Sequence, residues 1–212
     1  MTGNYDFSLT AGHAALLVVD LQRGFCDPQV SEALGFDSSP HFRQRVDDLV
    51  LPNACRLIAA ARSAGVEVIY TVIEALTADG RDRSLDHKRS HFLIPKGSAG
   101  GEVMPEIAPA GDEMVLAKTA SGIFNATNID YLLRNLGIER LAILGVYSHQ
   151  CVESAVRDAA DRGYLVTLVS DACAAKTAAQ EAATAEGMRA YARVTATEDL
   201  LKELHARGVS AA

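Results

Sequence analysis

Short apolar runs alternate with longer amphipathic stretches along most of the chain, and the two patterns predict strands and helices in turn. Most of the apolar runs are continuous, which is typical of strands that are buried on both faces of a sheet. The predicted strands are residues 14–19, 66–72, 113–117, 141–147, 165–169 and 193–196. Strands that alternate with helices in this way predict a parallel sheet with helices on both faces.

Four stretches have apolar side chains at helical spacing: residues 53–64, 127–136, 152–162 and about 198–207. A glycine follows each of the first three, at Gly65, Gly137 and Gly163, where a helix commonly ends. Thr127 and Thr197 are candidate N-caps. The fold expected is one α/β domain over residues 1–212, with three layers (α/β/α) and a mostly parallel, six-stranded, Rossmann-like central sheet.

The stretch from 77 to 112 does not fit this alternation, because it is polar and rich in glycine, proline and charge. A connection of this length in a compact domain is usually functional or mobile. We therefore expect a lid or a subunit-contact loop near 77–112. The alternative is a solvated surface excursion.

Composition narrows the classes of function. The 212 residues carry a net charge of -7, which argues against a nucleic-acid groove. No apolar run approaches the roughly 20 residues that span a bilayer, so we expect no membrane partner. The first residues lack the pattern of a signal peptide, and the four cysteines form no CxxC pair, so reduced thiols and a cytoplasmic location are expected. No GxGxxG or GxxxxGK[ST] motif follows a predicted strand, so nucleotide binding is the least favoured of the functions considered.

Three polar residues stand where predicted strands end. Asp20 and Lys118 each directly follow a strand, and Cys151 follows another after a short turn and opens a predicted helix. Ligands of open α/β sheets bind outside the carboxyl ends of the strands. Taken singly, such an aspartate is often a cap, such a lysine a surface charge and such a cysteine a small buried apolar side chain. Together they make a workable active site.

The chemistry of these groups suits nucleophilic catalysis. A thiol reacts as the thiolate, which the start of a helix and a nearby ammonium both favour. Cys151 has the first by position, and Lys118 could supply the second. Asp20 could take the thiol proton and pass it to a leaving amine. Backbone N–H groups at the turn before the helix could hold an oxyanion.

Longer segments of the chain resemble the isochorismatase-like cysteine hydrolases. The resemblance is carried by VVDLQRGFCDP (18–28) and by the stretch 116–173, within which GVYSHQCVESAVRDAADRGY is most specific. It implies a catalytic triad of Asp20, Lys118 and Cys151, a covalent intermediate on the cysteine, and a homo-oligomer, a tetramer or dimer. It also implies a cis Val146–Tyr147 peptide bond and an oxyanion hole made by the backbone N–H groups of Tyr147 and Cys151.

The resemblance also bears on metals. Nicotinamidases of this family carry an Asp-x-His pair after the second long strand and bind a divalent metal, but this chain reads TVIEALTADG at 71–80. We therefore predict no metal and no cofactor. His87 and His91 have the i, i+4 spacing of a zinc helix, yet they lack the HExxH glutamate, so a surface or lid role is expected.

Within the family, the stretches 79–98 and 124–138 look most like amidohydrolases of biuret, triuret, ureidoacrylate and N-carbamoyl compounds. The predicted function is hydrolysis of a C–N bond in a small linear amide or ureide through Cys151. The candidate pocket residues are Gln22, Phe25, Glu74, Phe124 and Asn125. The two phenylalanines could instead belong to the core.

Three points stay open at this stage. The loop cations Arg81, Arg83, Lys88 and Arg89 could bind a substrate carboxylate or simply be solvated. Tyr147 stands in a YSHQ sequence that departs from the family's more usual pattern, so it could shape the pocket differently. The alternatives for function are a nicotinamidase-like or other small-amide hydrolase, and a non-catalytic binding member of the fold.

Overall fold

A computed structural model describes residues 5–9, 13–36 and 39–208, and its centre is a parallel six-stranded sheet. The strands run in the spatial order β3-β2-β1-β4-β5-β6. Their bounds are β1 (Ala14–Val19), β2 (Glu67–Ile73), β3 (Met114–Lys118), β4 (Arg140–Val146), β5 (Leu165–Ala174) and β6 (Arg193–Thr195). All six predicted strands are confirmed, and β5 continues five residues beyond its predicted end.

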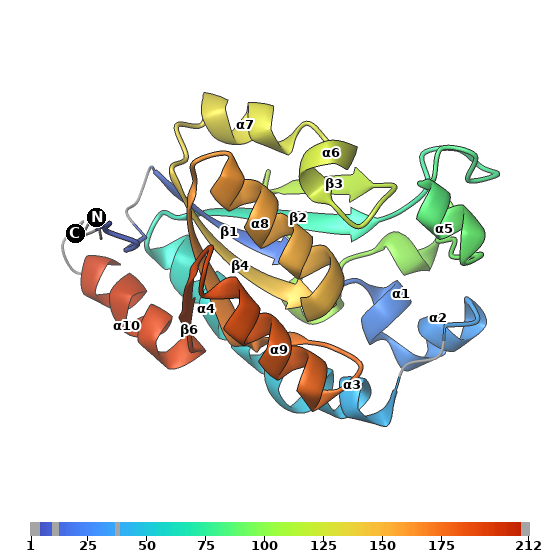
Figure 1. Ribbon diagram of the computed structural model, residues 1–212, viewed down its shortest axis with the longest axis horizontal. Coiled ribbons are helices and arrows are strands. Elements are labelled where there is room, and N and C mark those ends of the chain that lie inside the picture. Colours follow the sequence, from blue (N-terminus) through green and yellow to red (C-terminus); the bar gives the residue numbers. More distant parts are fainter. Residues whose placement is uncertain (1–4, 10–12, 37–38, 209–212) are drawn as a thin grey trace.

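Helices cover both faces of this sheet, which confirms the predicted three layers (Figure 1). Helices α8 and α9 pack on one face, and α4 and α10 pack on the other. The helices are α1 (Arg23–Cys26), α2 (Pro28–Ala33), α3 (Pro40–Arg45), α4 (Leu51–Ser63), α5 (Leu85–Arg89), α6 (Ile123–Ala126), α7 (Ile129–Asn135), α8 (Glu153–Asp161), α9 (Ala178–Met188) and α10 (Thr197–Gly208). Two π-helical turns, Val46–Val50 and Ser148–Val152, precede α4 and α8, and 3₁₀ turns occur at Ala99–Gly101 and Pro105–Ile107.

The four predicted helices are present, but the pattern missed the 11-residue α9 as well as the short helices. Predicted helix 127–136 is α7, which begins after a separate turn, α6. Helices α2 and α3 begin with a proline after a capping residue: Asp27 before Pro28 and Ser39 before Pro40. These cap-proline pairs are a signal by which the two helices could have been predicted.

The order of the strands sets the place of the site. The chain builds outward from β1 to β3, returns to β4 beside β1, and builds outward again to β6. The carboxyl ends of β1 and β4 therefore form the switch point at which open α/β sheets bind ligands. Gly145 lies there at a φ of 127°, and a Cβ on it would approach the Val19 carbonyl oxygen to 2.0 Å, so only glycine allows β4 this close to β1.

The segment 77–112 is folded against the rest of the domain. It contains α5 and two 3₁₀ turns. The Met104 N–H donates to the Leu21 carbonyl at 3.0 Å, and Gln22 and Val103 form an antiparallel bridge. These contacts fasten the segment to the chain just after β1, so it forms part of the surroundings of the β1 end.

Candidate active site

The three residues singled out in the sequence converge at the carboxyl edge of the sheet. Asp20 directly follows β1 and has a φ of 54°, Lys118 is the last residue of β3, and Cys151 lies in the π-helical turn that leads into α8. Each is at most 3% exposed. Charged side chains are almost never buried this deeply unless they are paired, so we expect Asp20 and Lys118 to be held by specific partners.

Lys118 is the centre of the group. Its Nζ lies 2.8 Å from Asp20 Oδ2 and 3.3 Å from Cys151 Sγ. It also donates to the carbonyl oxygens of Ala120 and Ser121, each at 3.1 Å. An ammonium has three N–H donors and no acceptor, so these oxygens and the sulfur hold it in one position between the acid and the thiol.

Asp20 is oriented through the neighbouring strand. Thr71 on β2 donates its hydroxyl to Asp20 Oδ1 at 2.7 Å, and the Asp20 N–H donates to the Thr71 carbonyl at 3.0 Å. One carboxylate oxygen is therefore occupied by Thr71, and the other faces Lys118. The carboxylate is held in place from both sides.

The thiol and the ammonium have shifted pKa values. Burial and the negative charge of Asp20 raise the pKa of Cys151 to about 12, against the opposite effect of Lys118. Burial opposes the charged form of Lys118, but Asp20 and Cys151 outweigh it and raise the pKa of Lys118. The raised pKa favours the protonated thiol, whereas the sequence argument from the helix start and Lys118 favoured a thiolate. Burial and Asp20 are the reason for the difference.

The peptide bond between Val146 and Tyr147 is cis, as the family resemblance implied. The Tyr147 carbonyl accepts hydrogen bonds from the N–H groups of Gln150 at 3.0 Å and Val152 at 3.3 Å. These bonds close the turn that carries Cys151. The oxyanion-hole role of the Tyr147 and Cys151 N–H groups stays a prediction.

A cavity of about 580 Å³ opens beside Cys151. Four aromatic rings line it: Phe25, Phe36, Phe92 and Tyr147. Phe36 and Phe92 stack with their centroids 4.7 Å apart, and Tyr147 meets Phe25 edge-on at 5.5 Å. Its ionisable and polar lining consists of Asp86, His87, Ser90, His91, Ser121, Gln150 and Lys176. A cavity with stacked aromatic rings and several polar groups suits a small planar molecule.

The five predicted pocket residues fall in different places. Phe25 lines the cavity. The side-chain amide of Gln22 is occupied by backbone groups of Ile73 and Gly100, and Glu74 accepts from the Gly97 N–H at 2.6 Å. Phe124 packs against Arg162 and Tyr164, and Asn125 is exposed. Gln22, Glu74, Phe124 and Asn125 thus lie outside the lining, because residues that follow a strand can turn into the core or to the surface as readily as into a pocket.

The loop cations also lie outside the cavity lining. Arg81 pairs with Asp79, and Arg83 donates to the backbone carbonyls of Gly80 and Phe92. His91 is exposed at the cavity, but His87 is buried in its wall on α5. The sequence argument placed both histidines at a surface or lid and had no signal for the burial of one of them.

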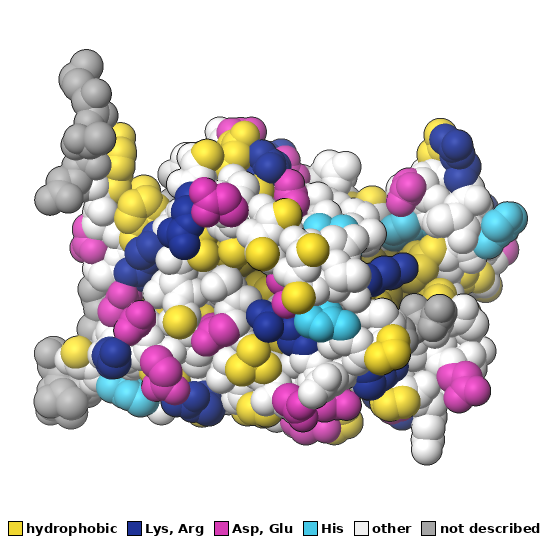
Figure 2. Space-filling model, turned by 60° about the horizontal axis from the view of Figure 1, so that its bottom comes forward, with side chains coloured by type: hydrophobic (Ala, Val, Ile, Leu, Met, Phe, Trp, Pro, Cys, Tyr) yellow, Lys and Arg dark blue, Asp and Glu magenta, His cyan; other side chains and the backbone are white. Residues whose placement is uncertain are grey.

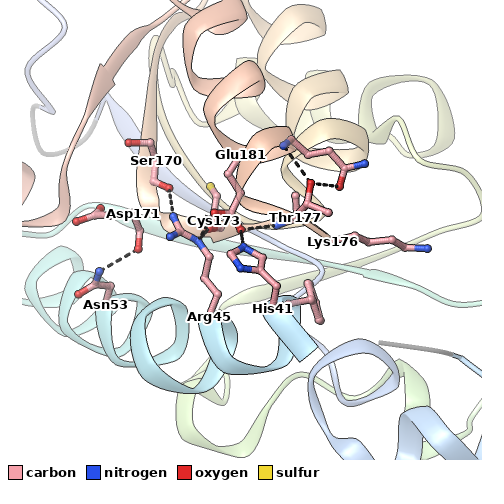
Figure 3. Close-up of polar contacts among 12 residues, drawn as sticks. His41, Arg45, Asn53, Ser170, Asp171, Cys173, Lys176, Thr177 and Glu181 are labelled. Carbon is pink, nitrogen blue, oxygen red and sulfur yellow. Dashed lines mark hydrogen bonds and ion pairs between the residues drawn. The ribbon is translucent and has the colours of Figure 1, made fainter. Parts of the chain in front are cut away.

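The cation that lines the cavity is Lys176, which sequence reasoning missed. The segment that carries it is fixed by Glu181, which pairs with His41 and Arg45, each at 3.0 Å, and accepts from the Ala175 N–H at 3.1 Å (Figure 3). Arg45 also donates to the Cys173 carbonyl at 2.8 Å. In Figure 3 the Lys176 side chain extends away from this cluster.

Neither the charges on the outer surface nor a cluster of metal-binding side chains points to a second site in the described residues. Lys and Arg side chains are interspersed with Asp and Glu over the face shown in Figure 2. Within the described ranges, no helix is long and apolar enough to cross a membrane, and no three His, Cys, Asp or Glu side chains form a group that could hold a metal ion. The prediction of a metal-free site stays a prediction.

Comparison with known sequences identifies relatives over most of the chain. The family model of the isochorismatase domain matches residues 14–199. A ureidoacrylate amidohydrolase, RutB of Variovorax paradoxus, is 31% identical over 183 residues, which covers 78% of this chain and 70% of the relative. A probable inactive nicotinamidase of Arabidopsis thaliana is 30% identical over 173 residues, covering 78% and 82% of the two chains.

Solved structures have the same fold. A cysteine hydrolase of Pseudomonas syringae pv. phaseolicola superimposes with a TM-score of 0.82 over 96% of this chain and 99% of that one, at 22% identity. The N-carbamoylsarcosine amidase of Thermoplasma acidophilum superimposes with a TM-score of 0.70 over 87% of this chain and 96% of that one, at 26% identity.

Proposed function

The chain belongs to the isochorismatase family of hydrolases, and on that premise we propose that it is a cysteine amidohydrolase that cleaves a C–N bond of a small linear amide or ureide. One observation carries the proposal: Lys118 Nζ lies 2.8 Å from Asp20 and 3.3 Å from Cys151 Sγ, and Cys151 faces a cavity. A thiol, a base and a cation are the groups that nucleophilic acyl transfer needs.

The first half-reaction forms a thioester. Asp20 accepts the proton of the Cys151 thiol, and Sγ attacks the substrate carbonyl carbon, so that an S–C bond forms and the carbonyl oxygen becomes an oxyanion. Lys118 stabilises the negative charge on sulfur as it develops. The N–H groups of Tyr147 and Cys151 are proposed to bind the oxyanion. The C–N bond then breaks, and the amine leaves with the proton that Asp20 held.

The second half-reaction restores the thiol. Asp20 accepts a proton from water while the water oxygen attacks the thioester carbon. The S–C bond breaks, the acid product leaves, and the proton returns to Sγ. A raised thiol pKa suits this cycle, because the nucleophile is ionised only when Asp20 removes its proton, and the sulfur is reprotonated afterwards. We propose this cycle without a metal or cofactor, since each proton transfer takes place between substrate, water and residues of this chain.

The substrate class is argued from the cavity and the relatives. Stacked aromatic walls about a small cavity suit a planar carbonyl compound, and ureides are planar. RutB is named for ureidoacrylate, and the neighbouring amidase for N-carbamoylsarcosine. Both names describe a carbonyl flanked by nitrogen in a linear molecule. We also expect a cytoplasmic location and a dimer or tetramer. Light scattering on the purified protein would test the oligomeric state.

An ammonia-release screen tests the proposal. The panel is biuret, triuret, ureidoacrylate, N-carbamoyl amino acids, nicotinamide and simple aliphatic amides, each with and without EDTA. Release from linear ureides that is insensitive to EDTA and abolished in Cys151→Ala is expected. Preference for nicotinamide with strong EDTA inhibition would support the nicotinamidase-like alternative. Binding without release from any compound would support a non-catalytic member of the fold.

A further inference from the structure

His87 is a buried side chain in the wall of the cavity that the mechanism does not use. It is 5% exposed and lies on α5, within the segment expected to be a lid. The backbone N–H of His87 donates to Ser84 Oγ at 3.2 Å, and the backbone carbonyl of His87 accepts from the Phe92 N–H at 2.9 Å. The Ser84 N–H in turn donates to the carbonyl of Thr119, the residue after Lys118, at 2.9 Å. These hydrogen bonds connect α5 to the residue that follows Lys118 at the end of β3.

The two ring nitrogens of His87 are in different environments. Nδ1 is sealed from solvent and has no hydrogen-bond partner. The ring packs against Phe92 with the centroids 4.8 Å apart. His87 lines the cavity. Because Nδ1 is sealed, we infer that the ring meets the cavity through its other edge, where Nε2 lies. An unpartnered polar atom beside a ligand cavity calls for an explanation.

The protonation of the ring follows from its surroundings. Burial, with a smaller contribution from the positive charge of Lys118, lowers the pKa of His87 below its ordinary value. The neutral ring has one N–H donor and one acceptor lone pair. A sealed N–H without a partner is rarer than a sealed acceptor, so the proton belongs on Nε2 and the lone pair on Nδ1. His87 therefore presents an N–H donor to the cavity that contains Cys151.

From this geometry we propose that His87 Nε2 donates a hydrogen bond to a second acceptor oxygen of the substrate, distant from the carbonyl that Cys151 attacks. The inference rests on the proposed function and narrows it. The preferred substrates carry two acceptor oxygens, as a ureide with a distal carbonyl or carboxylate does. Simple aliphatic amides, with one carbonyl, would leave the buried donor unpaired and bind less well, because such a site rejects a substrate that lacks the matching group.

Substitutions at His87 separate this role from packing. A glutamine places its amide nitrogen near the position of Nε2, an asparagine places it near Nδ1, and a leucine retains bulk without a donor. Each change is made in the Cys151→Ala background, which binds without turnover. Calorimetry then measures the affinity for three probes: biuret, N-carbamoylglycine and butanamide. Thermal unfolding of each variant establishes that it is folded.

The expected pattern is specific. His87→Leu weakens binding of biuret and N-carbamoylglycine by about tenfold or more, and His87→Gln stays within about threefold of the parent. His87→Asn behaves like leucine, and none of the three changes the affinity for butanamide by more than about threefold. The proposal is overturned if leucine leaves ureide affinity unchanged, if asparagine restores it as well as glutamine, or if neither two-oxygen probe binds.

The same variants in the active enzyme keep this result apart from the proposed function. If the ammonia-release screen succeeds but His87→Leu has the same ratio of kcat/KM for biuret over butanamide as the parent, the hydrolase stands and the role of His87 fails. If ureides bind in the expected pattern but no ammonia is released, the role in recognition stands and hydrolysis fails.

Discussion

Two buried cysteines near the carboxyl ends of adjacent strands are equally exposed but have different neighbours. Cys151 follows β4, and Cys173 lies on β5 in register with Gly145 of β4. Each is 3% exposed, and burial raises the pKa of each thiol to about 12. Cys173 donates to the Val169 carbonyl at 3.3 Å, whereas Cys151 has Lys118 at 3.3 Å and faces the cavity.

Under the proposed mechanism, this difference makes Cys151 and not Cys173 the nucleophile. The resting acidity does not separate the two residues, since burial raises the pKa of both thiols. What separates them is an ammonium in contact with the sulfur, a carboxylate paired with that ammonium, and a cavity that can hold a substrate. The strand order supplies all three at the ends of β1, β3 and β4, whereas the Cys173 thiol near the end of β5 donates to a backbone carbonyl and lies outside the cavity lining.

Removing each thiol in turn should produce the largest contrast. Cys151→Ala is expected to lower kcat by roughly 10⁴-fold or more, because no other group can form the thioester. Cys173→Ala should keep kcat within about threefold and cost about 1 kcal/mol of unfolding free energy, as a small core truncation does. Steady-state ammonia release and urea unfolding measure both. Equal kinetic losses in the two variants would remove the distinction between the thiols.

Removing the base sharpens the contrast further. Asp20→Asn retains the size of the side chain but cannot accept the thiol proton, so kcat should fall by about 10²–10⁴-fold. The matched control is Asp171→Asn on β5, whose carboxylate accepts from the Thr197 N–H and hydroxyl, each at 2.8 Å. This control should lose stability but not kcat. An Asp20→Asn enzyme with normal kcat would contradict the assignment of the base.

The buried ion pair should be visible in stability as well. Lys118→Met leaves the Asp20 carboxylate buried without its cation, and is expected to cost about 3–5 kcal/mol of unfolding free energy. In the double variant Asp20→Asn/Lys118→Met no charge is left unpaired, so part of this loss should return. Urea unfolding of the four proteins forms a double-mutant cycle. Additive losses would show that the two side chains are not coupled.

A pH dependence of stability is expected from Cys173, because burial is the largest cause of its raised thiol pKa. Its thiol has a pKa of about 12 in the folded protein against an ordinary value of 9.0. Between these values the unfolded chain has released the proton and the folded protein has not, so stability falls as pH rises. Each such thiol contributes a slope of about 1.4 kcal/mol per pH unit. Cys173→Ala should flatten the decline between pH 9 and 12 by that amount, and an unchanged slope would count against the burial of this thiol.

The sequence predicted the residues at the strand ends better than it predicted the residues that line the cavity. Continuous apolar runs locate buried strands, and parallel strands end at one edge, so Asp20, Lys118 and Cys151 could be brought together without a structure. The walls come from the segment 77–112, whose packing depends on contacts distant in sequence. Nothing local distinguishes His87, which is buried, from His91, which is exposed.

The raised thiol pKa was missed for a related reason. A helix start and a lysine can be read from sequence, and both favour a thiolate. The depth of burial and the position of Asp20 beside the sulfur depend on how β1, β3 and β4 meet, and these two effects dominate. In the same way, Gln22 and Phe124 follow predicted elements as a pocket residue would, but tertiary packing turns both into the interior.

The claim that Cys151 alone forms the covalent intermediate is tested most directly by acid-quenching the enzyme during turnover of a ureide and mapping its cysteine peptides by mass spectrometry. The mechanism predicts an acyl adduct on the peptide that contains Cys151, and unmodified Cys26, Cys55 and Cys173. An adduct on Cys173 in place of Cys151, or undiminished ammonia release by the Cys151→Ala variant, would contradict it.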